Sequence, residues 1–573
     1  MATDTRPTDG QATTGSAAAA RAALDVMLTD AAIGRGRTGR FLDPLSAAKL
    51  AGALARRPLA LARRVEGLGA ELGRVAAGSS SLVPAKSDRR FADRAWKESW
   101  IFRRLMEAYL AAGGTAEGLI DDADLDWQAE RQVRFMVENA LDAIAPTNVP
   151  FANPVVLKET IDRGGANLVR GGRRLVRDIS KRRLPAMVDT TEFEVGGNLA
   201  VTPGSVVLRT DVFELIQYRP QSAQVYEVPI VIVPPTINKY YVLDLAPGRS
   251  VVEYLLQQGH QVFMVSWRNP DREQGHFDFD TYASATLEAG RTASDIAGAS
   301  AVNVMAACSG GIISAGALGH LAAEGRLGSV SSLTLMVCAI DSAQAGTTSA
   351  FTTKEIAATA IAQSARKGYL EGEALASVFA WLRPNDLIWN YVINNYWLGK
   401  DPPAFDILYW NQDTVRLAAG LHRDFVMLAM QNSLARADGF TVLGSSVDLG
   451  DVTVDSYIVA GSADHIVPWR NAYATTQLLG GDTQFVLSAS GHIQALINPP
   501  GPDSRSSYQV ADEYPADPDQ WLERAVARRG SWWPDHIEWL STRSGERKAA
   551  PEALGSSSHE AQAKAPGSYV HAR

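Results

Sequence analysis

The chain has 573 residues, which is too long for one ordinary domain and indicates at least two. Hydrophobic residues make up 46% and charged residues 21%, the composition of a globular protein with a large core. Lys and Arg number 55 against 63 Asp and Glu, so the formal net charge of −8 argues against a nucleic-acid binder that uses a basic face. No stretch reaches the roughly 18 apolar residues of a transmembrane segment, and the polar start of the chain lacks the features of a secretory signal.

Two further classes of site are excluded by motif. Cys308 and Cys338 are too few for a disulfide framework or for a zinc site built from cysteines, so we expect a soluble intracellular protein with reduced thiols and no bound metal. Two glycine-rich spots, RGGAN at 163–167 and RGGRR at 170–174, lack the strand context of a phosphate loop. No GxxxxGK[ST] motif occurs either, which excludes nucleotide hydrolysis.

The amino-terminal part of the chain has helical periodicity. Residues 1–20 are rich in Thr, Gly, Ala and Asp and predict a disordered tail. From 21 to 204, Leu, Ala and Val recur at helical spacing between Arg and Glu, so we predict an all-helical domain. Its role is either packing alone, or contact of an exposed apolar helix face with a partner, a polymer or a lipid surface.

The period changes at about residue 205. Short apolar runs rich in β-branched residues alternate with helical stretches up to residue 541, which predicts an α/β domain with a mostly parallel sheet covered on both faces. Residues 343–440 break this rhythm and predict a cap inserted over a site. Residues 542–573 have few aromatic or β-branched residues and predict a second disordered tail.

The motif with the clearest chemistry is VNVMAACSGG. An apolar strand leads into Ala306-Ala307-Cys308-Ser309-Gly310-Gly311, and a helix follows, which is the layout of a nucleophile elbow with Cys308 as nucleophile. The start of the helix favours a thiolate at Cys308, and the backbone N–H of Ser309 points to where an oxyanion would form. Ala306 replaces the usual first glycine of such a box. The alternative is a tight turn that contains a buried structural cysteine.

Partners for Cys308 follow late strands of the predicted sheet. Asp464 comes after the run DSYIVAG and His492 after TQFVLSAS, in the chain order nucleophile, acid, histidine of an α/β-hydrolase. We expect His492 to take the proton of Cys308 and Asp464 to orient the imidazole. Asp341 is an alternative acid. His465 is either a supporting site residue or a residue that only fixes the Asp464 loop, whereas Cys338 lies inside an apolar strand and should be buried.

The loop PPTINKYYVLDL follows the first central strand and should help to form the oxyanion hole. Ile237 or one of its neighbours is the candidate for the second N–H donor. Lys239 is either solvated or steers an anionic substrate.

At these residues the sequence resembles the polyhydroxyalkanoate synthases, of the single-polypeptide type. The resemblance covers about residues 85–541. It is carried by DRRFADRAWKESW, DAIAPTNVPFANP, PPTINKYYVLDL, QGHQVFMVSWRNPD, AACSGG, WLRPNDLIWNYVINNYWLGKDPPAFDILYWNQDTVRL, GSADHIVPW, SGHIQALINPP and GSWWPDHIEWL.

The resemblance implies an α/β-hydrolase fold and polymerisation of (R)-3-hydroxyacyl-CoA with release of coenzyme A, which is a substrate group and not a cofactor. The family's nucleophile, general base and aspartate map onto Cys308, His492 and Asp464. Ala306 departs from the family's G-x-C-x-G box, which puts rate or substrate preference in doubt. Asp464 either serves His492 or acts on the substrate hydroxyl.

The resemblance also implies partners and a location. It implies a homodimer in the cytoplasm, working at the surface of polymer granules on a growing polyester chain. Lys239 and Arg268 are candidates for the coenzyme A phosphates. The aromatic residues of the cap either exclude water from the site or only pack: Trp389, Tyr391, Tyr396, Trp397 and Trp410. Two other functions stay open, a Cys-dependent thioesterase or polyester hydrolase of the same fold and a non-catalytic granule-associated protein.

Overall fold

The computed structural model describes residues 44–342, 354–372, 374 and 384–573, except residues 87, 182, 183, 465 and 503. The described residues form two compact units, each made of two separate stretches of sequence. The larger unit lies within residues 193–376 and 406–573, and the smaller within residues 32–192 and 377–405. The predicted tail at residues 1–20 lies outside the described residues.

The larger unit is built on an 11-stranded sheet with the order β15-β14-β13-β12-β7-β6-β4-β5-β2-β1-β17. Neighbours from β13 to β5 run parallel, and the pairs outside this block are antiparallel. The strands are β1 Gly204–Arg209, β2 Phe213–Tyr218, β4 Ile230–Val233, β5 Val262–Trp267, β6 Val302–Ala307, β7 Val330–Met336, β12 Asp455–Gly461, β13 Thr483–Ser488, β14 Ser507–Val510, β15 Val526–Arg529 and β17 Ala563–Lys564.

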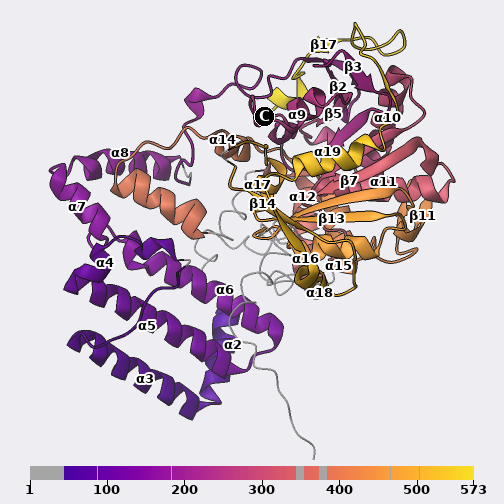
Figure 1. The fold of residues 1–573 in the computed structure, drawn as a ribbon. Coiled ribbons are helices and arrows are strands. Elements are labelled where there is room, and N and C mark those ends of the chain that lie inside the picture. The colour runs from indigo at the N-terminus through magenta and orange to yellow at the C-terminus, as the bar shows by residue number, and fades with distance from the viewer. Residues whose placement is uncertain are drawn as a thin grey trace, which may run out of the picture. The chain divides into compact units, whose positions relative to one another are not determined.

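Helices cover both faces of this sheet (Figure 1). Every residue of β4, β5 and β6 is buried, as expected for parallel strands between two helical layers. The helices of this unit are α9 Val251–Gln257, α10 Phe279–Ala297, α11 Ser309–Ala323, α12 Lys354–Lys367, α14 Asp406–Gln412, α15 Ala419–Gln431, α16 Trp469–Ala474, α17 His492–Leu496, α18 Pro518–Arg524 and α19 Trp533–Ser541. Three small two-stranded sheets accompany them: β10 Phe440–Val442 with β11 Ser445–Val447, β3 Gln224–Tyr226 with β16 Arg547–Ala549, and β8 Tyr369–Leu370 with β9 Leu417–Ala418.

The smaller unit is helical, as the sequence predicts for this region. Its helices are α2 Pro44–Ala55, α3 Pro58–Ala77, α4 Ala95–Glu98, α5 Trp100–Ala123, α6 Trp127–Ile144, α7 Pro154–Asp162 and α8 Ala166–Ser180. The DRRFADRAWKESW stretch supplies part of the core of this unit. The rings of Phe91 and Trp96 pack edge to face, and both residues belong to one apolar cluster with Met106 of α5. No helix of the described residues is both long and apolar enough to cross a membrane.

The predicted cap at residues 343–440 is divided between the two units, which corrects the expectation of one insertion. Residues 343–353 and 375–383 lie outside the described residues. The π-helical turns η8 Asn385–Trp389 and η9 Val392–Trp397 belong to the smaller unit, whereas residues from Asp406 onward belong to the larger one. The indole of Trp397 donates to the carbonyl of Asn148 at 3.0 Å, so this aromatic residue packs within the helical unit.

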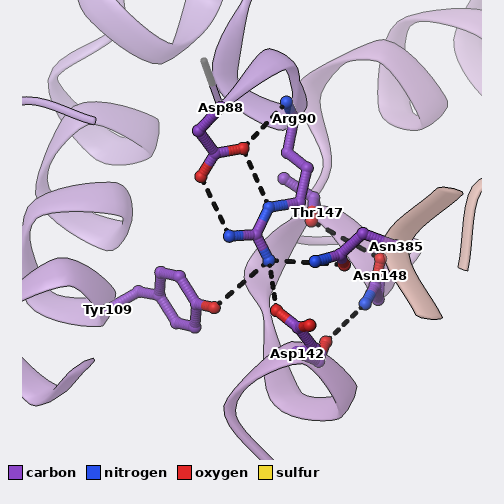
Figure 2. A network of polar contacts seen from close by, with 7 residues as sticks. All are labelled: Asp88, Arg90, Tyr109, Asp142, Thr147, Asn148 and Asn385. Carbon is purple, nitrogen blue, oxygen red and sulfur yellow. Dashed lines mark hydrogen bonds and ion pairs between the residues drawn. The ribbon is translucent and has the colours of Figure 1, made fainter. Parts of the chain in front are cut away.

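One arginine ties the late segment of the helical unit to its earlier part (Figure 2). Arg90 lies 2.9 Å from a carboxylate oxygen of Asp88 and 2.8 Å from one of Asp142 on α6. The same guanidinium donates at 3.4 Å to the hydroxyl of Tyr109 on α5 and to the side-chain oxygen of Asn385. Burial alone would lower the pKa of Arg90, but the surrounding oxygen atoms outweigh burial and raise the pKa. This cation therefore joins α5, α6 and η8 into one unit.

The carboxyl-terminal residues 542–573, predicted to be a disordered tail, are ordered in the larger unit. β16 pairs with β3 and β17 pairs with β1. The carboxylate of Glu214 on β2 accepts hydrogen bonds from the N–H groups of Ser568 and Tyr569 at 2.8 and 2.9 Å, and Val570 is buried in the main core. The polar composition misled the prediction, because backbone pairing and buried hydrogen bonds replace apolar area in this segment.

The packing of α8 on η9 can be tested with two adjacent glycines. A Cβ atom on Gly171 would lie 1.8 Å from the carbonyl oxygen of Tyr396, whereas one on Gly172 would meet nothing within 4 Å. Gly171→Ala should therefore lower the free energy of unfolding of the helical unit by about 1–3 kcal/mol. Gly172→Ala is the matched control and should stabilise the helix by up to about 1 kcal/mol. Urea unfolding followed by circular dichroism measures both changes, and equal stabilities would contradict the described contact.

Candidate active site

Cys308 occupies the sharp turn between β6 and α11. Its φ of 49° and ψ of −122° are unusual for a residue with a side chain, and the turn is held by a 2.9 Å hydrogen bond from the Cys308 N–H to the carbonyl of Met336 at the end of β7. The thiol is half-buried. A strained backbone at a strand-to-helix turn is the geometry predicted for a nucleophile elbow.

Small residues allow the turn to pack closely. A Cβ atom on Gly310 would lie 2.4 Å from the carbonyl oxygen of Pro234, so only glycine lets α11 approach the end of β4. Gly311 faces the sulfur of Cys338 in the same way, at 2.7 Å from a built Cβ. Ala306, the departure from the family box, is fully buried within β6 and pairs with Val233 and Leu335. An alanine therefore fits here without altering the strand.

The sheet order brings the predicted partners together. β7 lies between β6 and β12, and β13 is the next strand beyond β12, so the residues that follow β6, β12 and β13 share one edge of the parallel block. Nδ1 of His492 lies 2.7 Å from Oδ2 of Asp464, and both residues are buried. The other oxygen of Asp464 accepts hydrogen bonds from the N–H groups of Ile466 and Val467 at 2.8 and 2.9 Å.

The electrostatics of His492 connect all three side chains. Burial lowers the pKa of the imidazole, but the Asp464 carboxylate and the hydrogen-bonding sulfur of Cys308 outweigh burial and raise the pKa of His492 to about 10. Because a carboxylate only accepts, Nδ1 carries a proton toward Asp464 and Nε2 is left for Cys308. The arrangement can hold a proton on the buried imidazole of His492.

The loop after β4 is fastened to the start of α11. The N–H of Thr236 donates to the hydroxyl oxygen of Ser309 at 2.9 Å, and the hydroxyl groups of the two residues lie 3.1 Å apart. Ile237 is the next residue of this loop and is buried. Because the Thr236 N–H is already engaged, Ile237 stays the predicted second donor of the oxyanion hole beside the Ser309 N–H.

Asp341, the alternative acid, and Cys338, the second cysteine, both contact residues other than His492. The carboxylate of Asp341 accepts a hydrogen bond from the amide of Asn432 at 2.8 Å, whereas the residue that contacts His492 is Asp464. Cys338 is buried as predicted, and burial raises the pKa of its thiol well above the ordinary value, which makes it unreactive. His465 lies outside the described residues.

Lys239 and Arg268, the two cationic candidates for substrate phosphates, instead contact the protein itself. The ammonium of Lys239 is buried, lies 2.8 Å from a carboxylate oxygen of Asp413 and donates to the carbonyl of Val570 at 2.6 Å. The guanidinium of Arg268 lies 5.7 Å from the centre of the Tyr569 ring. Lys239 therefore anchors the loop after β4 to the carboxyl-terminal segment, a role that the sequence did not reveal because that segment lacks apolar periodicity.

Comparison with known proteins identifies the family to which the chain belongs. A family model described as "Poly-beta-hydroxybutyrate polymerase (PhaC) N-terminus" matches residues 87–255, and one described as "alpha/beta hydrolase fold" matches residues 229–499. The chain is 44% identical over 519 residues to Poly(3-hydroxyalkanoate) polymerase 2 of Ectopseudomonas oleovorans, a match covering 90% of this chain and 92% of that protein. It is 38% identical over 506 residues to the polymerase subunit PhaC of Cupriavidus necator, covering 87% and 85%. The chain belongs to the poly(3-hydroxyalkanoate) polymerase family.

Membership of the polymerase family confirms the resemblance found in the sequence, and with it the predicted α/β-hydrolase fold after a helical region. The curated relatives are polymerases, so the chain is an enzyme of the acyltransferase type. The roles of Cys308, Asp464 and His492 stay predictions, and their shared position at one sheet edge supports these roles.

The coupling of Asp464 to His492 can be tested by titration. Because the pKa of His492 is raised from 6.5 to about 10, its proton stabilises the folded state fully below about pH 6.5, and this stabilisation is lost as the pH rises toward 10. Asp464→Asn removes the anion while burial remains, so the pKa of His492 should fall well below 10. Histidine-labelled NMR measures this pKa. Asp341→Asn is the control and should leave it unchanged, and an unaltered pKa in Asp464→Asn would contradict the ion pair.

Proposed function

We propose that the chain polymerises (R)-3-hydroxyacyl groups taken from coenzyme A thioesters, with release of coenzyme A, and that Cys308 carries the acyl chain. The family supports the reaction class, since the named relatives are poly(3-hydroxyalkanoate) polymerases. The single observation that carries the residue assignment is the 2.7 Å contact of His492 with Asp464 at the sheet edge that Cys308 shares, where Cys308 also raises the pKa of His492.

In the first half-reaction the proton of Cys308 rests on Nε2 of His492, and the thiolate attacks the carbonyl carbon of the incoming thioester. The N–H groups of Ser309 and Ile237 would stabilise the tetrahedral oxyanion. The bond to the coenzyme A sulfur then breaks, and the leaving thiolate takes the proton from His492. One thioester replaces another, so the step is nearly balanced in energy.

In the second half-reaction the 3-hydroxyl group of another unit gives its proton to His492 and attacks the acyl carbonyl on Cys308. An ester bond forms, and the thiolate of Cys308 leaves. Both oxygens of Asp464 are engaged, one by His492 and one by two backbone N–H groups, which favours an orienting role for Asp464 over direct action on the hydroxyl. His492 then serves as the base in both half-reactions.

The partners and location follow from the same family. We propose that the growing polyester and the granule surface are the polymer partners, that the enzyme acts as a homodimer and that it works in the cytoplasm. The test is fractionation of producing cells. The protein should sediment with the granules when polymer is present.

Cysteine variants test the reaction and its nucleophile together. With (R)-3-hydroxybutyryl-CoA the wild-type chain should release coenzyme A, measured with a thiol-reactive dye, and form polymer, measured by size-exclusion chromatography. Cys308→Ala should lower the release rate about 1000-fold or more, because the acyl acceptor is lost. Cys338→Ala is the matched control and should keep a rate near that of the wild type, since its thiol is buried and its pKa lies well above the ordinary value.

The product decides between the competing functions. Free 3-hydroxybutyrate in place of polymer would identify a Cys-dependent thioesterase or polyester hydrolase. Absence of coenzyme A release from the wild-type chain would favour a non-catalytic granule-associated protein. Release by Cys308→Ala at the wild-type rate would show that Cys308 is not the nucleophile.

A further inference from the structure

The most basic stretch of the chain lies in and just after α8. Residues 166–183, ANLVRGGRRLVRDISKRR, hold seven basic residues and one acidic residue, although the whole chain has a net charge of −8. This stretch contains the RGGRR motif, and no residue of this motif belongs to the proposed catalytic set. Such a local reversal of charge suggests an anionic partner.

One face of α8 is committed to packing inside the helical unit. Asn167 is fully buried, and its amide donates to the carbonyl of Trp397 at 2.8 Å. Gly171 lies against the backbone of Tyr396, whose hydroxyl donates to the carboxylate of Asp178 at 2.8 Å. Asp178, the single acidic residue of the stretch, is therefore hydrogen-bonded on the packed face of α8. It does not neutralise the positive charges on the opposite face of the helix.

The opposite face combines apolar and cationic side chains. Val169, Val176 and Ile179 are 57%, 68% and 65% exposed, and their spacing of seven and three residues places them in one stripe along the helix. Exposed arginines flank this stripe at positions 170, 173 and 177. Within the described part of the chain, the guanidinium groups of these three arginines make no ion pair with a carboxylate, whereas Arg174 pairs with Asp401.

We propose that the outward face of α8 binds an anionic phospholipid surface. In this arrangement the Val169, Val176 and Ile179 side chains enter the boundary of the acyl chains while the flanking arginines pair with lipid phosphates, as in helices that lie in a membrane interface. An ester polymer has no charge along its chain, so it would not account for the arginines. A second copy of α8 would place like charges together, and a nucleic acid would leave the apolar stripe in water.

This inference does not depend on the proposed catalysis, because no residue of α8 belongs to the Cys308, Asp464 and His492 set. The test uses the full chain and sedimentation of sucrose-loaded vesicles. Vesicles of equal parts phosphatidylglycerol and phosphatidylcholine should carry the protein down at low salt. Vesicles of phosphatidylcholine alone should carry down much less, and high salt should reduce binding to the anionic vesicles.

Two sets of variants separate charge from apolar contact. The first variant removes the three exposed arginines of α8 together, by Arg170→Gln, Arg173→Gln and Arg177→Gln. Its partition coefficient for anionic vesicles should be about 100-fold lower than that of the wild type. The control with the same change in net charge combines Arg56→Gln, Arg94→Gln and Arg529→Gln, exposed arginines outside α8, and should bind as the wild type does.

The second variant replaces the apolar stripe, by Val169→Ser, Val176→Ser and Ile179→Ser, and should also lose most of its binding to anionic vesicles. Its control replaces two exposed apolar residues of α3, by Leu59→Ser and Val65→Ser, and should keep its binding. Circular dichroism verifies that each variant is folded. Equal binding to neutral and anionic vesicles, no binding of the wild type at low salt, or equal loss in the control variants would each overturn the proposal.

Discussion

The buried contact between Asp464 and His492 is the interaction on which the proposed catalytic arrangement depends. An imidazolium in a buried position is unfavourable unless an anion compensates for the lost water. Asp464 provides that anion, and two backbone N–H groups of its own loop keep it in place. A shift of this loop would remove both the orientation and the charge of His492 at once.

The second requirement is a backbone that can present a sulfur atom to that imidazole. The unusual dihedral angles of Cys308 are held by the hydrogen bond to β7 and by the close approach of α11 to the carbonyls at the end of β4. Three parallel strands, β4, β6 and β7, therefore hold this strained turn, and β4 also leads into the loop that contains Ile237. The central sheet is the common support of the proposed nucleophile, base and acid.

Much of this organisation was predictable from the sequence. Short apolar runs identify buried parallel strands, and the ends of such strands meet at one edge, so Cys308, Asp464 and His492 could be grouped before any coordinates. The ordered structure of the carboxyl-terminal segment and the buried contacts of Lys239 were not predictable from the sequence. Their contacts with Glu214, Asp413 and Val570 join residues far apart in the chain through hydrogen bonds, and periodicity carries no signal for such contacts.

The anchoring of the loop after β4 has a consequence for substitutions far from Cys308. The buried ammonium of Lys239 lies beside the carboxylate of Asp413 and donates to the carbonyl of Val570. A change that displaces the segment around Val570 would leave this buried cation with one partner fewer, at a cost of about 1–3 kcal/mol. Such a variant would shift the loop that carries Ile237, although the altered residue lies far from Cys308 in the sequence.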